Sequence, residues 1–141
     1  MRILLAYFLL VCASQGVAGP VVRVSIEANG EGAGLIVQAY RTALRSTPGV
    51  LVVFAAQRPY LLLEVECLSS QSQSGIHTGY AWAWAIVNPD NKAEIFGPGV
   101  AICGPTTRNI AEAASANVLT MEHDLFVPLL ENAKSAPNPS P

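Results

Sequence analysis

Charged residues are scarce in this sequence, and no segment concentrates charge of one sign. Asp, Glu, Lys and Arg make up only 13% of the 141 residues, and the formal net charge is −2. Proteins that bind nucleic acid or anionic membrane surfaces usually carry a cluster of Lys and Arg, which this chain lacks. We therefore expect no nucleic-acid partner. Because 51% of the residues are hydrophobic, the composition also excludes a disordered polyelectrolyte.

Histidine is rarer still, which leaves few ways to build a metal site or an acid–base pair. His77 and His123 are far apart, and the triplet 122–124 would point its three polar side chains in different directions on a helix. Glu64 and Glu66 share one face of a strand about 7 Å apart, which is the ordinary pattern of a solvated outer face. We expect no metal site and no catalytic residues.

The glycine-containing segment 29–34 lies where a strand leads into a helix, as a dinucleotide-binding loop does. That fingerprint requires a glycine five residues after Gly30, and the chain has Leu35 there. The segment is better interpreted as a flexible turn. We therefore expect no cofactor, and an enzyme is the less favoured class.

Only three cysteines occur, and Cys12 lies in the amino-terminal apolar segment. Cys67 and Cys103 each lie within or just after a strand-like apolar run. An oxidising compartment would permit a disulfide between them, and two small buried thiols would fit the same pattern. The sequence leaves both alternatives open.

Long hydrophobic runs are absent apart from residues 3–13, which are too few to span a bilayer as a helix. A charged start, this short apolar stretch and the small residues of 14–19 are the three parts of a secretory signal peptide. We predict a signal peptide over 1–18, with cleavage after Ala18. The mature protein should be periplasmic or secreted, without a transmembrane helix.

The rest of the chain has the size and pattern of a single α/β domain. Residues 19–133 are enough for a hydrophobic core, and the proline-rich end, 134–141, should be a disordered tail. The segment 21–28 alternates apolar and polar residues and predicts a strand, whereas 35–44 has the helical spacing of apolar residues. Pro48 should end that helix.

Four further strands and a short extended piece follow. The run 50–55 is short, continuous and rich in β-branched residues, which predicts a strand buried on both faces. Segments 60–69 and 79–88 alternate, and 93–96 should pair with the latter as a hairpin. The run 97–103 begins Gly-Pro-Gly, which should break that strand and leave a short extended piece.

A long helix that is capped by Thr106 or Thr107 and that kinks or restarts at Pro128 completes the pattern. The order β-α-β-β-β-β-α predicts an α/β (α+β) fold, a two-layer sandwich with a mixed sheet of four to five strands and two main helices. The first strand–helix–strand unit favours parallel pairing through a right-handed crossover. The later strands should pair antiparallel.

The sharpest local feature is an aromatic row, in which Tyr80, Trp82 and Trp84 share one face of a strand. Facing solvent, these rings would form a platform for a sugar or a partner protein, and we take them as candidate binding residues. Facing inward, they would pack in the core. The alanine-rich carboxy-terminal helix favours core packing, because its small side chains leave room for indole rings.

The segment 21–67 resembles the α/β domain of several bacterial envelope proteins. The likeness lies in the strand 22–26, the glycine-containing loop, the helix that ends over 40–46, and the strands within 48–53 and 59–65. These proteins include the amino-terminal domain of the Tol-Pal translocation protein, the curli-secretion lipoprotein and the lipoprotein activator of penicillin-binding proteins. The resemblance implies an envelope module that works through protein contacts, with no catalytic residue to carry over.

We therefore expect an exported module that binds an envelope protein through a sheet edge or its aromatic-bearing face. The alternative is a small exported enzyme, or a binder of an anion or sugar, that uses the loop 97–107 beside a helix N-terminus. An exposed apolar face would favour the module, and a pocket with converging polar groups would favour the enzyme. The sequence does not specify the oligomeric state.

Overall fold

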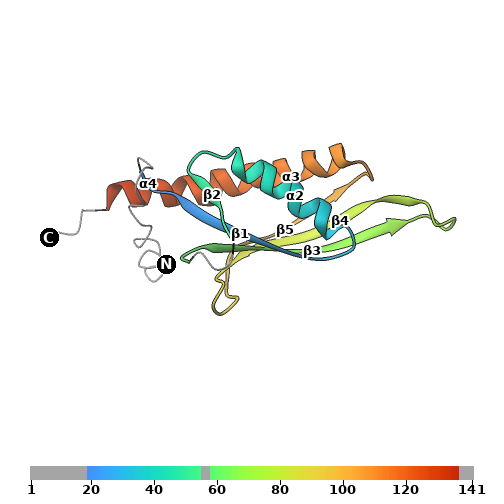
Figure 1. The fold of residues 1–141 in the computed structure, drawn as a ribbon, viewed down its shortest axis with the longest axis horizontal. Helices are drawn as coiled ribbons and strands as arrows, with labels where there is room; N and C mark the ends of the chain where they lie inside the picture. Colours follow the sequence, from blue (N-terminus) through green and yellow to red (C-terminus); the bar gives the residue numbers. More distant parts are fainter. Residues whose placement is uncertain (1–18, 55–57, 137–141) are drawn as a thin grey trace.

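The computed structural model describes residues 19–54 and 58–136. A five-stranded sheet carries helices on one of its faces (Figure 1). The predicted signal peptide and the last five residues of the predicted tail lie outside the described residues. The strands are β1 (Val22–Gly30), β2 (Val50–Val52), β3 (Leu61–Gln71), β4 (His77–Val87) and β5 (Glu94–Cys103). The helices are α2 (Ala33–Arg45), α3 (Thr107–Met121), the π-helical turn η1 (Glu122–Phe126) and α4 (Val127–Ser135).

The strand order across the sheet is β2-β1-β3-β4-β5. β1 pairs in parallel with β2 on one side and with β3 on the other, whereas β3, β4 and β5 pair antiparallel. This arrangement confirms the predicted two-layer fold, the mixed sheet and the order of elements. It also confirms the parallel pairing of the first strand–helix–strand unit.

One apolar stripe on each helix holds the helical layer against the sheet. On α2 the stripe is Ile36, Tyr40 and Leu44, spaced four residues apart and fully buried. α3 packs beside α2 and carries the second stripe. The core cluster comprises Val22, Val24, Ile36, Tyr40, Leu44, Leu61, Leu63, Val65, Cys67, Trp82, Trp84, Ile86, Ile110, Ala114, Val118, Met121 and Phe126.

The prediction that 50–55 is a strand buried on both faces is wrong. β2 has only three residues and lies at the edge of the sheet, where Leu51 is 48% exposed. The central place beside β1 is taken by the longer β3, which pairs with β1 from Val24 to Gly30. A continuous apolar run has no period that distinguishes a central strand from an edge strand.

Alternation also fails at the start of β3. The alternation of 60–69 places Leu62 on the same outward face as Glu64 and Glu66, but Leu62 is 1% exposed, and its antiparallel partner Val87 is 4% exposed. Both faces of the sheet are therefore covered at this end.

The Gly-Pro-Gly sequence does not end the fifth strand, contrary to the prediction. β5 runs through Gly97, and its register against β4 shifts so that three residue steps of β5 oppose two of β4. A bulge of this kind absorbs one extra residue without ending the pairing. Gly99 lies under the indole of Trp84, and a Cβ there would come within 2.2 Å of that ring.

The carboxy-terminal helix begins where its sequence predicts, and a π-helical turn interrupts it before Pro128. Thr106 is the N-cap of α3, and its hydroxyl accepts a hydrogen bond of 3.1 Å from the Asn109 amide. The π-helical turn η1 lies just before Pro128, which has no N–H with which to continue the α-helical hydrogen bonds. α4 ends at Ser135. Within the described ranges, no helix has the length and apolar character needed to cross a membrane.

A pair of glycine substitutions tests the turn between β1 and α2. Gly30 has φ +96°, and a Cβ there would lie 2.0 Å from the Cys67 carbonyl oxygen. We expect Gly30→Ala to lower the free energy of unfolding by more than about 1 kcal/mol, because both the conformation and the space exclude a side chain. Gly34 lies in α2 with no atom near its missing Cβ, so Gly34→Ala should raise stability by about 0.5–1 kcal/mol. Urea unfolding measures both, and equal stabilities would contradict this account of the turn.

Candidate functional site

The aromatic row lies in the core of the molecule. Trp82 is 3% exposed and Trp84 5% exposed, both on the face that the helices cover. Tyr80 is partly buried at the end of the row, where its ring lies 4.5 Å from that of His77. The sequence left two alternatives open, core packing and a solvent-facing platform, and the structure has core packing. The rings form no solvent-facing platform.

A buried polar cluster satisfies the hydrogen-bonding groups of these rings. Trp82 Nε1 donates to the Tyr40 hydroxyl at 2.8 Å, and that hydroxyl lies 2.7 Å from the side-chain amide of Asn117. With the amide oxygen of Asn117 turned toward the cluster, it accepts from Tyr40 and, at 3.3 Å, from Trp84 Nε1. Burial raises the pKa of Tyr40 to about 12, so its hydroxyl keeps the proton that it donates. The cluster ties α2 and α3 to β4.

The two cysteines are free thiols, separated by a strand. Cys67 on β3 pairs with Trp82 on β4, whereas Cys103 on β5 pairs with Tyr80. Two strands across a sheet span about 10 Å, which exceeds the roughly 7 Å limit between the Cα atoms of a disulfide. Burial raises the pKa of Cys67 to about 11 and also raises the pKa of Cys103.

The glutamates of β3 form ion pairs and hydrogen bonds on the outer face of the sheet. Glu64 accepts from Lys92 Nζ at 2.5 Å, and Glu27 lies 3.4 Å from the same nitrogen. Glu66 accepts from Asn29 Nδ2 at 3.0 Å. These side chains are solvated and held by separate partners, so they do not form a carboxylate pair over a substrate. In the described part of the chain, no three His, Cys, Asp or Glu side chains gather to hold a metal ion.

The segment 97–107 does not form the open loop that the alternative function requires. Most of it is β5, and the N-terminus of α3 is closed by its own residues. The Thr106 hydroxyl accepts from the backbone N–H of Asn109 and donates to the side-chain oxygen of the same residue, Oδ1, at 2.7 Å. The side chain of the cap thus lies where an anion would bind.

An apolar surface occupies the outer face of the sheet, opposite the helices. Leu68, Ala81 and Ile102 form one cross-strand row over β3, β4 and β5, and Ala83 and Val100 continue it in the next row. Leu68 is 72% exposed, Val100 77% and Ile102 84%. These five residues, here called the outer-face patch, are adjacent in the sheet and lie at its β5 edge. The surface is unusual because large exposed aliphatic side chains are grouped rather than scattered.

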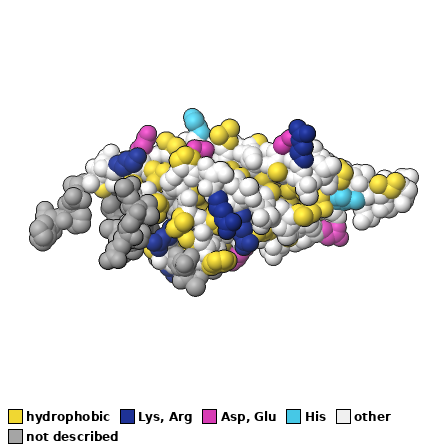
Figure 2. All heavy atoms as spheres, turned by 45° about the horizontal axis from the view of Figure 1, so that its top comes forward, with side chains coloured by type: hydrophobic (Ala, Val, Ile, Leu, Met, Phe, Trp, Pro, Cys, Tyr) yellow, Lys and Arg dark blue, Asp and Glu magenta, His cyan; other side chains and the backbone are white. Residues whose placement is uncertain are grey.

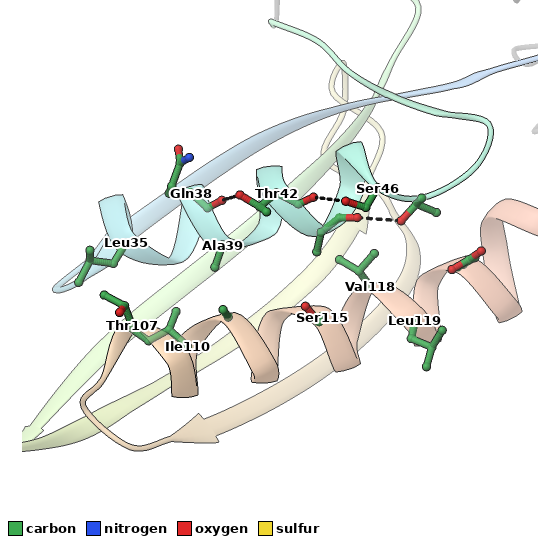
Figure 3. Close-up of a pocket in the computed structure, with 14 residues that line it drawn as sticks. Leu35, Gln38, Ala39, Thr42, Ser46, Thr107, Ile110, Ser115, Val118 and Leu119 are labelled. Carbon is green, nitrogen blue, oxygen red and sulfur yellow. Dashed lines mark hydrogen bonds between the residues drawn. The ribbon is translucent and has the colours of Figure 1, made fainter.

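A hollow surface lies between α2 and α3, on the other side of the molecule from the outer-face patch. Side chains from both helices converge on an open groove of about 500 Å³ (Figure 3). Small residues from both helices line it together with Ile110, Val118 and Glu122. Leu35 and Leu119 also line it, with 46% and 64% of their surface exposed. Figure 2, in which the helical layer is turned forward, shows hydrophobic side chains along this layer and Lys and Arg side chains gathered near its middle. We call this feature the helical groove.

The sequence pointed to neither surface. The outward positions of β3 and β4 follow from alternation, and this places Leu68 outside. The expected break at 97–99 hid the fact that Val100 and Ile102 extend the same face onto an edge strand. The groove depends on the packing of two helices that are far apart in the chain.

No protein-family model matches the chain, and no curated protein matches it significantly. Among solved structures, the PelC dodecamer from Paraburkholderia phytofirmans is 13% identical, covering 81% of this chain and 95% of its own, with a TM-score of 0.50. A second crystal form of PelC is 11% identical over 75% of this chain and 93% of its own, with a TM-score of 0.45. The uncharacterized lipoprotein B from Nitrosomonas europaea is 17% identical over 82% of this chain and 79% of its own, with a TM-score of 0.36.

The likeness to PelC at a TM-score of 0.50 shows a shared fold. At such low identity no residue role can be transferred from PelC to this chain. The resemblance to the Tol-Pal, curli-secretion and penicillin-binding-protein-activator domains stays a prediction.

The polar cluster can be tested by removing one hydroxyl. Tyr40→Phe leaves the Trp82 indole N–H without its closest acceptor, so we expect a loss of about 1–3 kcal/mol in the free energy of unfolding. Tyr60→Phe is the matched control, because Tyr60 is only partly buried, beside Arg58. Urea titration followed by tryptophan fluorescence measures both variants. Equal stabilities would show that the hydroxyl is dispensable.

The thiols should react slowly in the folded protein. Raised pKa values leave little thiolate near pH 7, so alkylation should be slower than for a free cysteine and should accelerate as the pH rises. Cys67 should be the slower, because only 3% of its surface is exposed. Mass spectrometry of Cys67→Ser and Cys103→Ser measures each rate, with urea-unfolded protein as control. If the intact mass of the unmodified chain, measured without reductant, were lower by two hydrogens, the thiols would instead form a disulfide.

Proposed function

We propose that this protein is an exported envelope module that works by assembling with protein partners through the outer-face patch. The observation that carries the proposal is the grouping of Leu68, Val100 and Ile102 on a sheet face that the helices leave uncovered. Surface of this kind is costly to leave in water, because each exposed aliphatic side chain forgoes roughly 1.5–3 kcal/mol of burial. A partner that covers the patch recovers part of that free energy.

Export is proposed from the amino-terminal sequence. The apolar segment 3–13 and the small residues after it are typical of a secretory leader, and the periplasm is the compartment we propose. The envelope-protein resemblance of 21–67 supports the same location.

The solved structure with the same fold supports assembly as the mode of action. PelC is described as a dodecamer, so in that protein this fold associates with copies of itself. We propose a second copy of this chain as a partner, beside other envelope proteins. An enzyme receives no comparable support, because the candidate segment 97–107 is strand and capped helix.

A photo-crosslinking amino acid at position 102 tests this proposal in the native envelope. We expect discrete protein adducts from position 102 and none from position 51, an exposed aliphatic site on the opposite edge strand. The double variant Val100→Ser/Ile102→Ser should abolish capture of the partners by a tagged chain. Its stability should change by only about 0.5 kcal/mol, because both side chains are exposed. Full capture by the double variant would exclude the patch as the contact surface.

A further inference from the structure

We propose that the outer-face patch of one copy binds in the helical groove of the next copy, so that the chain assembles head to tail. This inference rests on the proposed function and names both sides of the contact. The occupant of the groove is thus a second copy of this chain.

Layer architecture favours this pairing. The sheet already packs one apolar face against α2 and α3 of its own chain, and its outer face presents a second apolar surface to solvent. A sheet that is apolar on both faces is normally covered by helices on both. The helical layer of a neighbouring copy can supply the second cover. Two outer faces packed on each other would leave both grooves empty.

The α2 side of the groove accepts apolar side chains because its three hydroxyl groups are already bonded. Thr42 donates to the Gln38 carbonyl at 3.0 Å, and Ser46 donates to the Thr42 carbonyl at 3.1 Å. Thr47 donates to the Ala43 carbonyl at 3.0 Å, so all three hydroxyls turn back onto their own helix (Figure 3). An apolar occupant therefore leaves none of these donors without a partner.

The spacing of the two surfaces also agrees. Val100 and Ile102 are two residues apart on a strand, which places them about 6.8 Å apart. Successive small residues along each wall of the groove, Ala39 and Ala43 on α2 or Ala111 and Ser115 on α3, are four residues apart on a helix, which corresponds to about 6 Å of rise. The two branched side chains can therefore lie between successive small residues on the helices.

The helix on one side of the groove and the strand on one side of the patch carry charge of opposite sign. α2 carries Arg41 and Arg45 and no acidic residue, whereas Glu122 lines the groove on the other side. Beside the patch, β3 carries Glu64 and Glu66, of which Glu64 is already paired with Lys92. Glu66 lies in the same cross-strand row as Ala83 and Val100 and is exposed. Its exposed carboxylate, which also accepts from Asn29 Nδ2, can pair with an arginine of α2 in the neighbouring copy.

Such a contact has a definite consequence for symmetry. The two surfaces of one interface are different, so in a dimer one copy still has a free patch and the other a free groove. Heterologous contacts of this kind close into a ring or continue as a filament.

The test uses two variants of the full chain, expressed with its own amino-terminal segment. Ala111→Arg fills the groove at an exposed position of α3, and Ile102→Glu places a charge in the patch. Each variant alone should be monomeric by native mass spectrometry and sedimentation, whereas the unmodified chain should form larger assemblies. A mixture of the two should form a heterodimer and stop there, because only one intact patch and one intact groove remain.

Matched controls separate surface effects from general damage. Ala116→Arg adds the same charge to α3 outside the groove, and Leu51→Glu adds a carboxylate on the far edge strand; both should assemble as the unmodified chain does. Fluorescence of the buried Trp82 and Trp84 verifies folding, and Ser115→Arg replaces Ala111→Arg if that variant unfolds.

Each other outcome overturns the head-to-tail contact. A groove variant that still forms dimers indicates an isologous contact between patches, and a mixture that stays monomeric excludes complementary surfaces. If the unmodified chain is monomeric while position 102 still captures a different envelope protein, the self-assembly inference fails and the proposed function stands. If position 102 captures nothing, the proposed function fails as well.

Discussion

The structure depends on how the two tryptophans of β4 are buried. Each indole carries an N–H that must be satisfied in an apolar core, and the Tyr40 hydroxyl with the Asn117 amide provides the acceptors. Because these groups come from α2 and α3, the helices are held over this strand in one position. The large inward side chains are matched by alanines at the outward positions, among them Ala81 and Ala83. One face of β4 therefore carries large core side chains, and the other presents a low, apolar surface.

The outward residues of the neighbouring strands, β3 and β5, determine the charge and polarity of that surface. On β3 the outward residues change from Glu64 and Glu66 to Leu68, and on β5 they are Val100 and Ile102. The outer face is therefore acidic toward β1 and apolar toward β5. A face divided in this way can orient a partner as well as bind it, because contact in the reverse direction would bury carboxylates against apolar groups.

The sequence was sufficient to predict the order of elements, the parallel first unit and the start of the long carboxy-terminal helix, because each depends on a local period or a cap. Ile110, Ala114 and Val118 lie where helical spacing places them, all buried. The errors have a common cause. Alternation says which residues share a face, but not which face the rest of the chain covers, so Leu62 and the edge position of β2 were missed. The candidate site was missed for the same reason. The sequence points to the aromatic row as the candidate binding surface, whereas the exposed aliphatic residues on the opposite face of the sheet form the outer-face patch.

The bulge in β5 disturbs backbone pairing at this edge of the sheet, while the side chains on the outer face stay exposed for contact. An edge strand normally offers a regular row of N–H and C=O groups to which another chain can add as a further strand. Here the regular ladder is interrupted between Phe96 and Gly99, and Pro98 has no N–H to donate. Only the part of β5 from Gly99 to Cys103 keeps a regular register. The chain can therefore expose Val100 and Ile102 beside an open edge while resisting uncontrolled growth by strand addition, a risk that rises whenever unassembled subunits are crowded together.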